Sequence, residues 1–443
     1  MLQSNKKLLV IKAKEESFWT SCKTISKNLI ATYVSLGDRE VSFYDLPQDF
    51  IKQDALFNTD YIENLYKKIE VEKPSAIVFV DHVPHAGKIL KALMSFMKAE
   101  KMPPLVFHVY GDFTYFSREW GWFAENYRLH PVKFIAASHA QENLLKFFLN
   151  NSSGLYRHLF PLSPKDFYFS AKEREKWRQD NKISNEEIVI LYSGRVSLQK
   201  NIDILLRKFV EMHDFYNRDF TLMIAGAIDD IGAPFMGVRG YEGYMFSKIQ
   251  HELKQIPTNI RNKIHFLGNL NQDELRKVNN ASDVFWSFSL YHDEDFGMSP
   301  AEALATGLPC LLTAWGGYLS FANNTDWACQ LVPVNLNEFG HKLDFSNLYS
   351  ITWDFGGEKY KKERSRRADG FMQSFSIEGS KNRLKEILDE DYKMFEGFAW
   401  PLGHLSLAQD QLQLRGSSEQ LIPSSENFYG LIYKNYIEIT KTS

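Results

Sequence analysis

Cysteine is scarce in this chain: among 443 residues only Cys22, Cys310 and Cys329 occur. An odd number of cysteines, far apart in the sequence, predicts neither a disulfide framework nor the closely spaced thiolates of a metal site. Reduced thiols are typical of the cytosol. The sequence therefore predicts a cytoplasmic protein without structural disulfides.

Long apolar runs are also missing. The run at residues 8–11 lies between lysines and is shorter than the roughly 7–15 apolar residues of a signal peptide. No segment approaches the ~20 apolar residues that cross a bilayer. We expect neither a cleaved leader nor a membrane span.

Neither sign of charge is in large excess, because 52 Lys and Arg residues face 55 Asp and Glu residues, for a net charge of −3. This balance gives no general attraction to nucleic acid, which we do not expect as a partner. The basic cluster Lys361–Arg367 is a local exception. It predicts either a peripheral membrane contact or a solvated helix face, and the intervening Glu363 and Ser365 favour the solvated face.

Short β-rich runs alternate with helical patterns twice along the chain, which predicts two doubly wound α/β domains. The expected strands are residues 8–11, 41–44, 76–80, 105–110 and 134–137 in the first half, and 188–192, 221–225, 264–267, 284–287 and 310–313 in the second. We place the domains at residues 1–170 and 171–388, with a tail at 389–443. The polar stretch 170–182 is expected to form an exposed helix near the boundary.

Two glutamates, Glu294 and Glu302, are separated by seven residues where a strand is followed by a loop and a helix. Ser299 is predicted to be the helix N-cap, Pro300 the first helical residue and Glu302 the acid of a capping box. A helix N-terminus offers unpaired N–H groups and a partial positive charge, which suit a diphosphate. Either glutamate alone would be read as a capping or solvated residue. The turn at Gly316-Gly317 and the Gly-Leu-Pro before it shift the interpretation toward a binding site.

A second loop follows the strand at residues 188–192. Gly194 lets the chain turn sharply, and Arg195 and Lys200 flank the turn where both can reach one anion. Asn201 is the predicted N-cap of the amphipathic helix that comes next. This pattern predicts a phosphate-binding loop.

Together these segments resemble the signature of the retaining family-4 glycosyltransferases, which have the GT-B fold of two Rossmann-like domains facing across a cleft. The resemblance covers roughly residues 8–388 and is strongest over residues 188–317. It implies that Glu294 binds hydroxyls of the donor sugar, that Glu302 takes the ribose hydroxyls, and that the C-terminal tail returns to the first domain as helices. The implied donor site consists of Gly194, Arg195, Lys200, Glu294, Phe296, Gly297, Met298, Ser299 and Glu302.

In the first domain the resemblance implies a strand histidine that faces the donor sugar, matched by His108, with Tyr110 as the alternative on the same face of the strand. His108 thus joins Glu294, Arg195 and Lys200 as an expected catalytic residue. His82 and His85, in the loop after another strand, are candidates to face the acceptor.

The resemblance implies a retaining, hexosyltransferase-like enzyme. It would move a sugar from a nucleotide-diphosphate donor to a hydroxyl of a glycan, a lipid-linked acceptor or a small molecule. We expect no cofactor and no metal, because Arg195 and Lys200 supply positive charge; the alternative is a divalent metal on the Asp-x-Asp triplet at residues 293–295. Two rival functions stay open: a GT-B sugar-phosphate enzyme, such as a phosphorylase or epimerase, and a catalytically idle subunit that binds nucleotide sugar.

Overall fold

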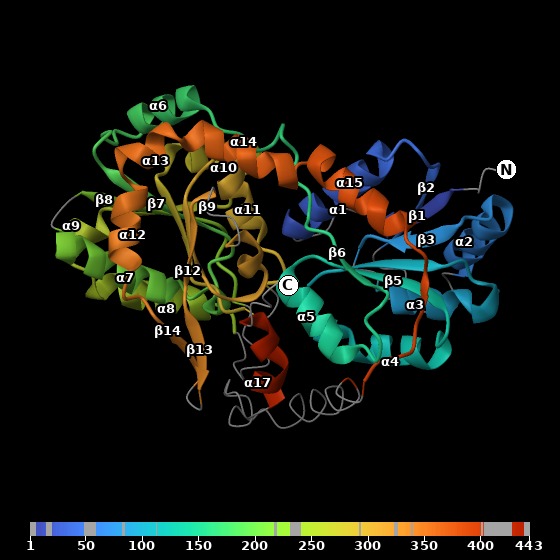
Figure 1. The fold of residues 1–443 in the computed structure, drawn as a ribbon. Coiled ribbons are helices and arrows are strands. Elements are labelled where there is room, and N and C mark those ends of the chain that lie inside the picture. The colour runs from blue at the N-terminus through green and yellow to red at the C-terminus, as the bar shows by residue number, and fades with distance from the viewer. Residues whose placement is uncertain are drawn as a thin grey trace. The chain divides into compact units, whose positions relative to one another are not determined.

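The computed structural model describes residues 6–14, 20–47, 59–81, 85–111, 113–216, 219–230, 241–291, 294–322, 327–337, 340–399, 402 and 428–437. The chain forms two compact units (Figure 1). Unit 1 comprises Met1–Pro161 and Ile377–Arg415, and unit 2 comprises Leu162–Ser376 and Gly416–Ser443. The chain therefore passes between the units at residues 161/162 and 376/377, whereas the sequence placed the boundaries at 170/171 and 388/389.

Unit 1 contains a seven-stranded sheet in the order β15-β5-β4-β3-β1-β2, with β6 also paired to β5. Its strands are β1 (Leu8–Ala13), β2 (Val41–Leu46), β3 (Ala76–Phe79), β4 (Leu105–Val109), β5 (Pro131–Ala136), β6 (Leu155–Arg157) and β15 (Lys393–Met394). Every pairing is parallel except that of β15 with β5. The strand order reverses between β1 and β3, and ligands of doubly wound sheets bind at the carboxyl ends of the strands where this happens.

Helices cover both faces of the unit 1 sheet. They are α1 (Thr20–Ser35), α2 (Thr59–Glu72), α3 (Ala86–Leu93), α4 (Ser117–Asn126), α5 (His139–Phe148) and α15 (Ile377–Asp389), with 3-10 turns η3 (Ala99–Lys101) and η4 (Phe113–Phe116). Figure 1 shows α1 and α15 on one face and α3 and α4 on the other.

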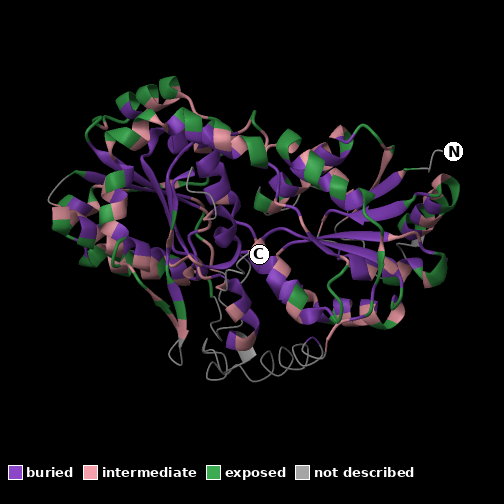
Figure 2. Cartoon of the chain, viewed as in Figure 1, coloured by how far each residue is buried: buried purple, intermediate pink, exposed green. Residues whose placement is uncertain are grey.

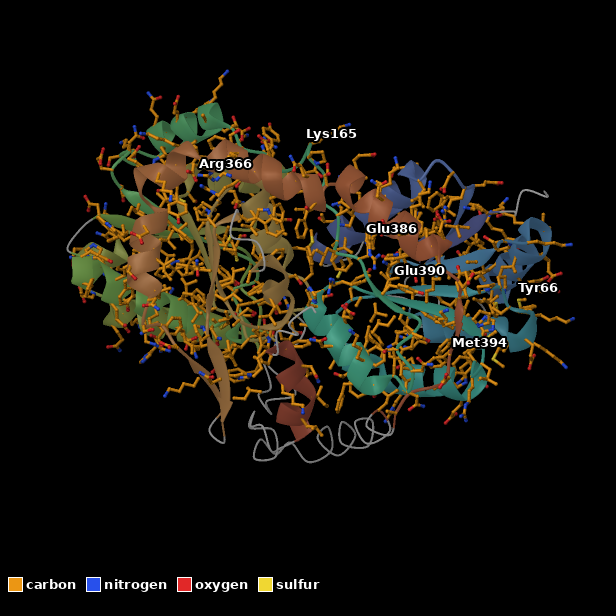
Figure 3. All side chains as sticks on the ribbon, viewed as in Figure 1. Tyr66, Lys165, Arg366, Glu386, Glu390 and Met394 are labelled. Carbon is orange, nitrogen blue, oxygen red and sulfur yellow. The ribbon has the colours of Figure 1, made fainter. Side chains whose placement is uncertain are left out.

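The sequence assigned α15 to the second domain, but it packs on α1 within unit 1. Lys133 of β5 is buried beneath the C-terminal end of α15. Its ammonium group donates to the carbonyls of Ile387 at 2.6 Å and Leu388 at 3.3 Å. A cation at this end satisfies carbonyls that lack helical partners and offsets the negative end of the helix dipole. Figure 3 labels Glu386 on the same helix and Glu390 just after it.

Unit 2 contains a six-stranded parallel sheet in the order β12-β11-β10-β7-β8-β9. Its strands are β7 (Ile188–Ser193), β8 (Phe220–Ala225), β9 (Ile264–Gly268), β10 (Val284–Ser287), β11 (Cys310–Thr313) and β12 (Cys329–Val332), and an antiparallel hairpin is formed by β13 (Val334–Asn337) and β14 (Gly340–Leu343). This is the strand order of dinucleotide-binding Rossmann folds, and it reverses between β7 and β10. The loops that leave β7 and β10 are the two predicted to bind the donor.

The helices of unit 2 are α6 (Ala171–Asp180), α7 (Ile202–Tyr216), α8 (Tyr244–Gln255), α9 (Thr258–Arg261), α10 (Gln272–Ala281), α11 (Met298–Ala305), α12 (Leu348–Phe355), α13 (Glu358–Lys362), α14 (Arg364–Phe375) and α17 (Phe428–Tyr433), with 3-10 turns η5 (Leu198–Lys200), η7 (Gly316–Phe321) and η9 (Lys434–Tyr436). The predicted tail is thus divided: β15 pairs in unit 1, whereas α17 and η9 belong to unit 2. Residues 403–427 of the tail lie outside the described residues.

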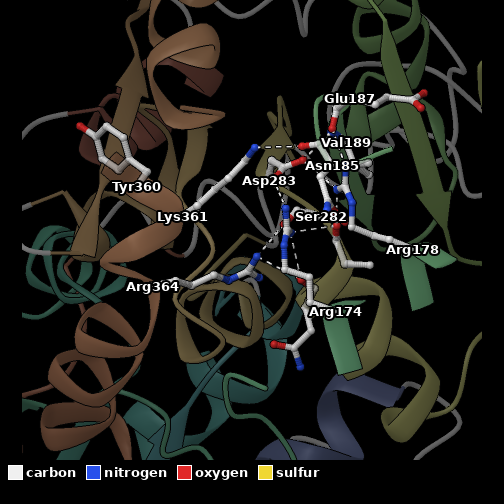
Figure 4. Close-up of polar contacts among 12 residues, drawn as sticks. Arg174, Arg178, Asn185, Glu187, Val189, Ser282, Asp283, Tyr360, Lys361 and Arg364 are labelled. Atoms are coloured by element: carbon white, nitrogen blue, oxygen red, sulfur yellow. Dashed lines mark hydrogen bonds and ion pairs between the residues drawn. The ribbon is translucent and has the colours of Figure 1, made fainter. Parts of the chain in front are cut away.

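All six residues of β7 are buried, as predicted for a central strand covered on both faces. Figure 2 shows the same pattern in both units, with buried strands and exposed outer helix faces. One carboxylate fixes β7 beside β10. Asp283 accepts from the amide of Val189 at 2.9 Å and pairs with Arg174 at 2.6 Å and Arg178 at 3.1 Å (Figure 4).

These arginines lie on α6, which explains why the first boundary precedes residue 170. The amide of Ser170 also donates to Asn280 Oδ1 at 3.0 Å, and Arg174 donates to three consecutive carbonyls at the end of α10. The segment 170–180 therefore belongs to unit 2. The helix predicted there is confirmed.

The basic cluster Lys361–Arg367 is divided between surface and interior, which corrects the prediction of one solvated face. Arg366, labelled in Figure 3, is exposed and pairs with Glu363 at 3.3 Å. Arg364 and Arg367 are only 3% exposed, because positions three apart share one helix face and here that face is covered. Both donate to backbone carbonyls, including that of Gly307 from Arg367 at 3.1 Å. Two of the cluster's cations are therefore structural.

Across the parts of the chain that the structure describes, the helices are too short or too polar to span a membrane.

Candidate functional site

The loop after β7 begins at Gly194, which has a φ of 141°. Its amide donates to the carbonyl of Ala225 at 2.9 Å. A Cβ added to Gly226 would lie 1.8 Å from the carbonyl oxygen of Gly194. The loops after β7 and β8 therefore pack backbone against backbone, which only glycine permits at these two positions.

Arg195 and Lys200 both lie close to one aromatic ring. The guanidinium carbon of Arg195 is 5.5 Å from the centroid of the Tyr291 ring, and Nζ of Lys200 is 5.6 Å from it. Arg195 also pairs with Asp229 at 3.0 Å, and Lys200 pairs with Glu294. The structure thus brings together three of the predicted residues and adds Tyr291, for which the sequence analysis found no role.

Asn201 directly precedes α7, as predicted, but its side chain does not make the expected N-cap contact. Its φ of 53° is left-handed, and its side chain donates to the carbonyl of Phe288 at 2.7 Å instead of accepting from the amides of α7. This bond links the end of the β7 loop to the chain that leaves β10.

Glu294 is buried, and the chain around it is held on both sides. Its amide donates to the carbonyl of Tyr291 at 3.0 Å, and its own carbonyl accepts from the amide of Gly317 at 2.6 Å. A Cβ on Gly316 would lie 2.3 Å from that carbonyl oxygen, and one on Gly317 would lie 2.2 Å from Cα of Phe296. The Gly316-Gly317 pair is needed because the glutamate loop lies directly on it.

Helix α11 begins two residues earlier than predicted. Gly297, with a φ of 94°, is its N-cap, so Ser299 and Pro300 are the second and third helical residues. The predicted Ser299 cap and the capping box with Glu302 are therefore wrong. Glycine is required here because the φ is left-handed and because a Cβ at this position would lie 2.6 Å from the ring of Tyr318. Proline is still tolerated within the first turn, where its missing N–H costs no helical bond.

The corrected start changes which amides face the loop. The amides of Met298 and Ser299 lie in the first turn of α11, where no carbonyl of the same helix is available to them. Ala301 already donates to the carbonyl of Gly297 at 3.1 Å. The N-terminus of α11 thus provides two N–H groups at the carboxyl edge of β10, beside Glu294.

Glu302 lies further along α11 and is 9% exposed. Burial, together with the nearby carboxylate of Asp166, raises its pKa to about 8. At neutral pH the carboxyl group is therefore mostly protonated, and it can donate as well as accept a hydrogen bond.

Phe296 does not present its side chain to the loop. Its ring is fully buried and lies 5.4 Å from the ring of Phe321 and 6.2 Å from that of Phe375. Its contribution is to anchor the loop between Glu294 and Gly297.

In unit 1, His108 is buried and its Nε2 lies 2.8 Å from the hydroxyl of Tyr33 on α1. Burial and the neighbouring His158 hold the pKa of His108 well below its ordinary value. Tyr110 faces the same side, as predicted, and its hydroxyl lies 3.4 Å from Asp81. Both side chains are engaged with their own unit.

His85 is the N-cap of α3. Its Nδ1 accepts from the amide of Gly87 at 3.0 Å, and its ring stacks on Phe116 at 4.5 Å. The other acceptor candidate, His82, lies outside the described residues. The same is true of Asp293 in the proposed metal triplet, and the described residues contain no group of three or more metal-ligating side chains.

Asp81 is a residue that the sequence analysis missed. It follows β3 at the strand reversal of unit 1 and lines a small pocket with His85 and Tyr110. Its carboxylate accepts from the amide of Ala13 at 2.7 Å and from the hydroxyl of Ser26. Burial raises the pKa of Asp81. The sequence could have indicated Asp81 as a site residue, because it is a carboxylate that follows a buried strand.

Part of this chain is similar in sequence to known proteins. Residues 173–343 match the family model described as "Glycosyl transferases group 1". An uncharacterized glycosyltransferase of Methanocaldococcus jannaschii is 27% identical over 195 residues, which are 44% of this chain and 43% of that protein. Sucrose synthase of Melioribacter roseus is 28% identical over 178 residues, 38% of this chain and 21% of that protein. The aligned segments thus span less than half the length of these curated relatives.

Among solved structures, the Anabaena protein HepE in complex with UDP is similar over 86% of this chain and 99% of that chain, with 14% sequence identity and a TM-score of 0.62. The chain has the GT-B fold, as the sequence predicted.

Proposed function

We propose that this protein is a retaining glycosyltransferase that moves a sugar from a nucleotide-diphosphate donor to a hydroxyl acceptor. The match to glycosyltransferases over residues 173–343 supports the reaction class. The observation that carries the proposal is the convergence of Arg195, Lys200 and Glu294 at the strand reversal between β7 and β10.

Each group has a role in this proposal. Arg195, Lys200 and the first-turn amides of α11 bind the diphosphate, on which negative charge builds as its bond to the anomeric carbon breaks. Glu294, held by Lys200, accepts hydrogen bonds from hydroxyls of the donor sugar. Glu302, protonated at neutral pH, exchanges hydrogen bonds with the ribose hydroxyls.

The reaction forms a bond between the acceptor oxygen and the anomeric carbon while the bond to the diphosphate breaks. The proton of the acceptor hydroxyl passes to the departing diphosphate, which leaves on the face that the acceptor enters. Retention and this proton transfer rest on the resemblance of the two loops to retaining enzymes.

The first test is a donor and acceptor screen with the full chain. Thermal shifts with UDP-, GDP- and ADP-sugars identify the donor, because a ligand that binds the folded state stabilises it. UDP-glucose comes first in the panel, since a structural neighbour has been crystallised with it. Proton NMR of the product then gives its anomeric configuration. A product of inverted configuration would refute retention, and turnover with inorganic phosphate or without acceptor would favour a phosphorylase or epimerase.

A substitution at Glu294 and one at a glutamate outside the site together test whether a loss of transfer is specific to the donor site. Glu294→Gln keeps the shape of the side chain and removes its charge, and we expect the rate of transfer to fall about 100-fold. Glu358→Gln is the matched control, because Glu358 is exposed on α13. Equal rates for Glu294→Gln and the wild type would exclude Glu294 from the reaction.

We also propose that transfer needs no divalent metal, because Arg195 and Lys200 supply the positive charge at the diphosphate. Transfer should then proceed in excess EDTA at more than half the original rate. Loss of transfer in EDTA, with recovery in Mg²⁺ or Mn²⁺, would contradict this and direct attention to Asp293 and Asp295.

A further inference from the structure

The C-terminal segment of the chain packs on unit 2 through two tyrosines. Tyr433, the last residue of α17, is 2% exposed and Tyr436 of η9 is fully buried. The segment lies outside residues 173–343, the part of the chain that matches the glycosyltransferase family model. Both rings meet the indole of Trp315, at centroid distances of 6.4 Å and 5.4 Å.

Trp315 is itself fully buried and follows β11. A third ring, His341 of β14, meets it edge-on at 4.8 Å. The indole is thus enclosed by rings from three elements, α17, η9 and β14, all distant from Trp315 in the sequence. Aromatic pairs of this kind are worth about 0.5–1.5 kcal/mol beyond the area they bury, so each restricts the orientation of the indole.

The indole is connected directly to the candidate donor site. Its Nε1–H donates to the carbonyl of Tyr291 at 2.8 Å, and the same carbonyl accepts from the amide of Glu294 at 3.0 Å. Two residues after Trp315, the amide of Gly317 donates to the carbonyl of Glu294 at 2.6 Å. Trp315 therefore holds the glutamate loop at Tyr291, and Gly317 holds it at Glu294.

We propose that the C-terminal segment Phe428–Tyr436 positions the donor site, with Trp315 as the positioning residue between the tyrosines and the loop that carries Glu294. The role of that loop rests on the proposed function. Removal of a tyrosine ring leaves space behind the indole, and its bond to the carbonyl of Tyr291 loosens. A misplacement of about 1 Å in a catalytic site costs up to about 100-fold in rate.

The test compares three substitutions in the full chain with the wild type by hydrogen exchange in the absence of donor. In Tyr436→Ala we expect the amides of Glu294 and Gly317 to exchange at least about tenfold faster. Tyr436→Phe keeps the ring and should exchange as the wild type does. Trp353→Ala is the matched control, because Trp353 stacks on Tyr216 at 4.9 Å in the same unit, and it should leave these two amides unchanged.

A fourth variant keeps the inference falsifiable if Tyr436→Ala does not fold. Trp315→Phe removes the indole N–H that donates to the carbonyl of Tyr291 and retains a ring, and it too should accelerate exchange at Glu294. Wild-type exchange at Glu294 in a folded Tyr436→Ala or in Trp315→Phe would overturn the inference.

Activity provides the second readout. Transfer by Tyr436→Ala should fall about tenfold, and Tyr436→Phe should restore it. Because the exchange measurement uses no donor, it tests the role of the C-terminal segment independently of the proposed function. Inactivity of the wild type with every nucleotide sugar would refute the proposed function, whereas unchanged exchange would refute the role of the C-terminal segment.

Discussion

The buried carboxyl of Glu302 should make unit 2 less stable as the pH rises. Folded Glu302 keeps its proton up to about pH 8, whereas its ordinary pKa is 4.5. Between these values the unfolded state binds fewer protons than the folded state, so the free energy of unfolding falls with increasing pH. At about 1.4 kcal/mol per pH unit the penalty is about 3 kcal/mol at pH 7 and disappears below about pH 4.5.

Glu302→Gln replaces the neutral acid with a neutral amide of the same shape and removes this penalty. We expect the variant to melt about 6–12 °C above the wild type at pH 7, given about 2–4 °C per kcal/mol for a domain of this size. The difference should shrink to about 1–3 °C at pH 5. Calorimetry of the full chain across pH 5–8 without donor measures both values.

Two results would refute the reasoning. A Glu302→Gln variant less stable than the wild type at pH 8 would mean that the carboxyl group is ionised and paired in the folded state. A stabilisation that does not depend on pH would mean that packing, and not protonation, is responsible. The exposed Glu358→Gln serves as control and should stay within about 0.5 kcal/mol of the wild type throughout.

Other predictions concern the scaffold of the site. Gly316→Ala places a Cβ 2.3 Å from the carbonyl oxygen of Glu294 at a φ of 57°, so we expect a loss of more than about 2 kcal/mol in unfolding free energy and weaker donor binding in titration calorimetry. Gly370→Ala, with nothing within 4 Å of the new methyl group, should do neither. Arg364 donates to the carbonyls of Asn279 and Ser282 at 2.6 Å, and Arg364→Met removes this donor. We expect denaturant unfolding to show a loss of about 3–5 kcal/mol in the free energy of unfolding. Arg366→Met, at a side chain 65% exposed, should change the same measurement by less than about 0.5 kcal/mol, and equal effects of the two arginines would contradict the buried network.

Much of the fold follows from the sequence because most residues of its central strands are apolar. Each of the ten predicted strands is found, and the segment 188–192 illustrates why: a strand buried on both faces has no polar position. The strands that were missed are short or partly exposed. β12 (Cys329–Val332) is buried at both ends but exposed or half-buried at its two middle residues, and β15 has two residues, both exposed.

The structure brings together predicted side chains that are close in sequence to a glycine turn, namely Arg195, Lys200 and Glu294, and it differs from the prediction where distant contacts decide. The N-cap of α11, Gly297, must be glycine because the ring of Tyr318 occupies the space of a Cβ, a contact that local capping preferences do not contain. Tyr291 was missed because its role comes from Arg195 and Lys200, which are about a hundred positions away in the chain. Arg364 was predicted to be solvated because a helical pattern alone does not show which face is covered.

The central claim is that Lys200, paired with Glu294, stabilises the departing diphosphate. The most direct measurement is the single-turnover rate of sugar transfer by Lys200→Met and by the control Lys277→Met, a lysine ion-paired on the surface of α10. We predict a fall of about 100- to 1,000-fold for Lys200→Met and no more than about twofold for Lys277→Met. A folded Lys200→Met enzyme that transfers sugar at the wild-type rate would contradict the account.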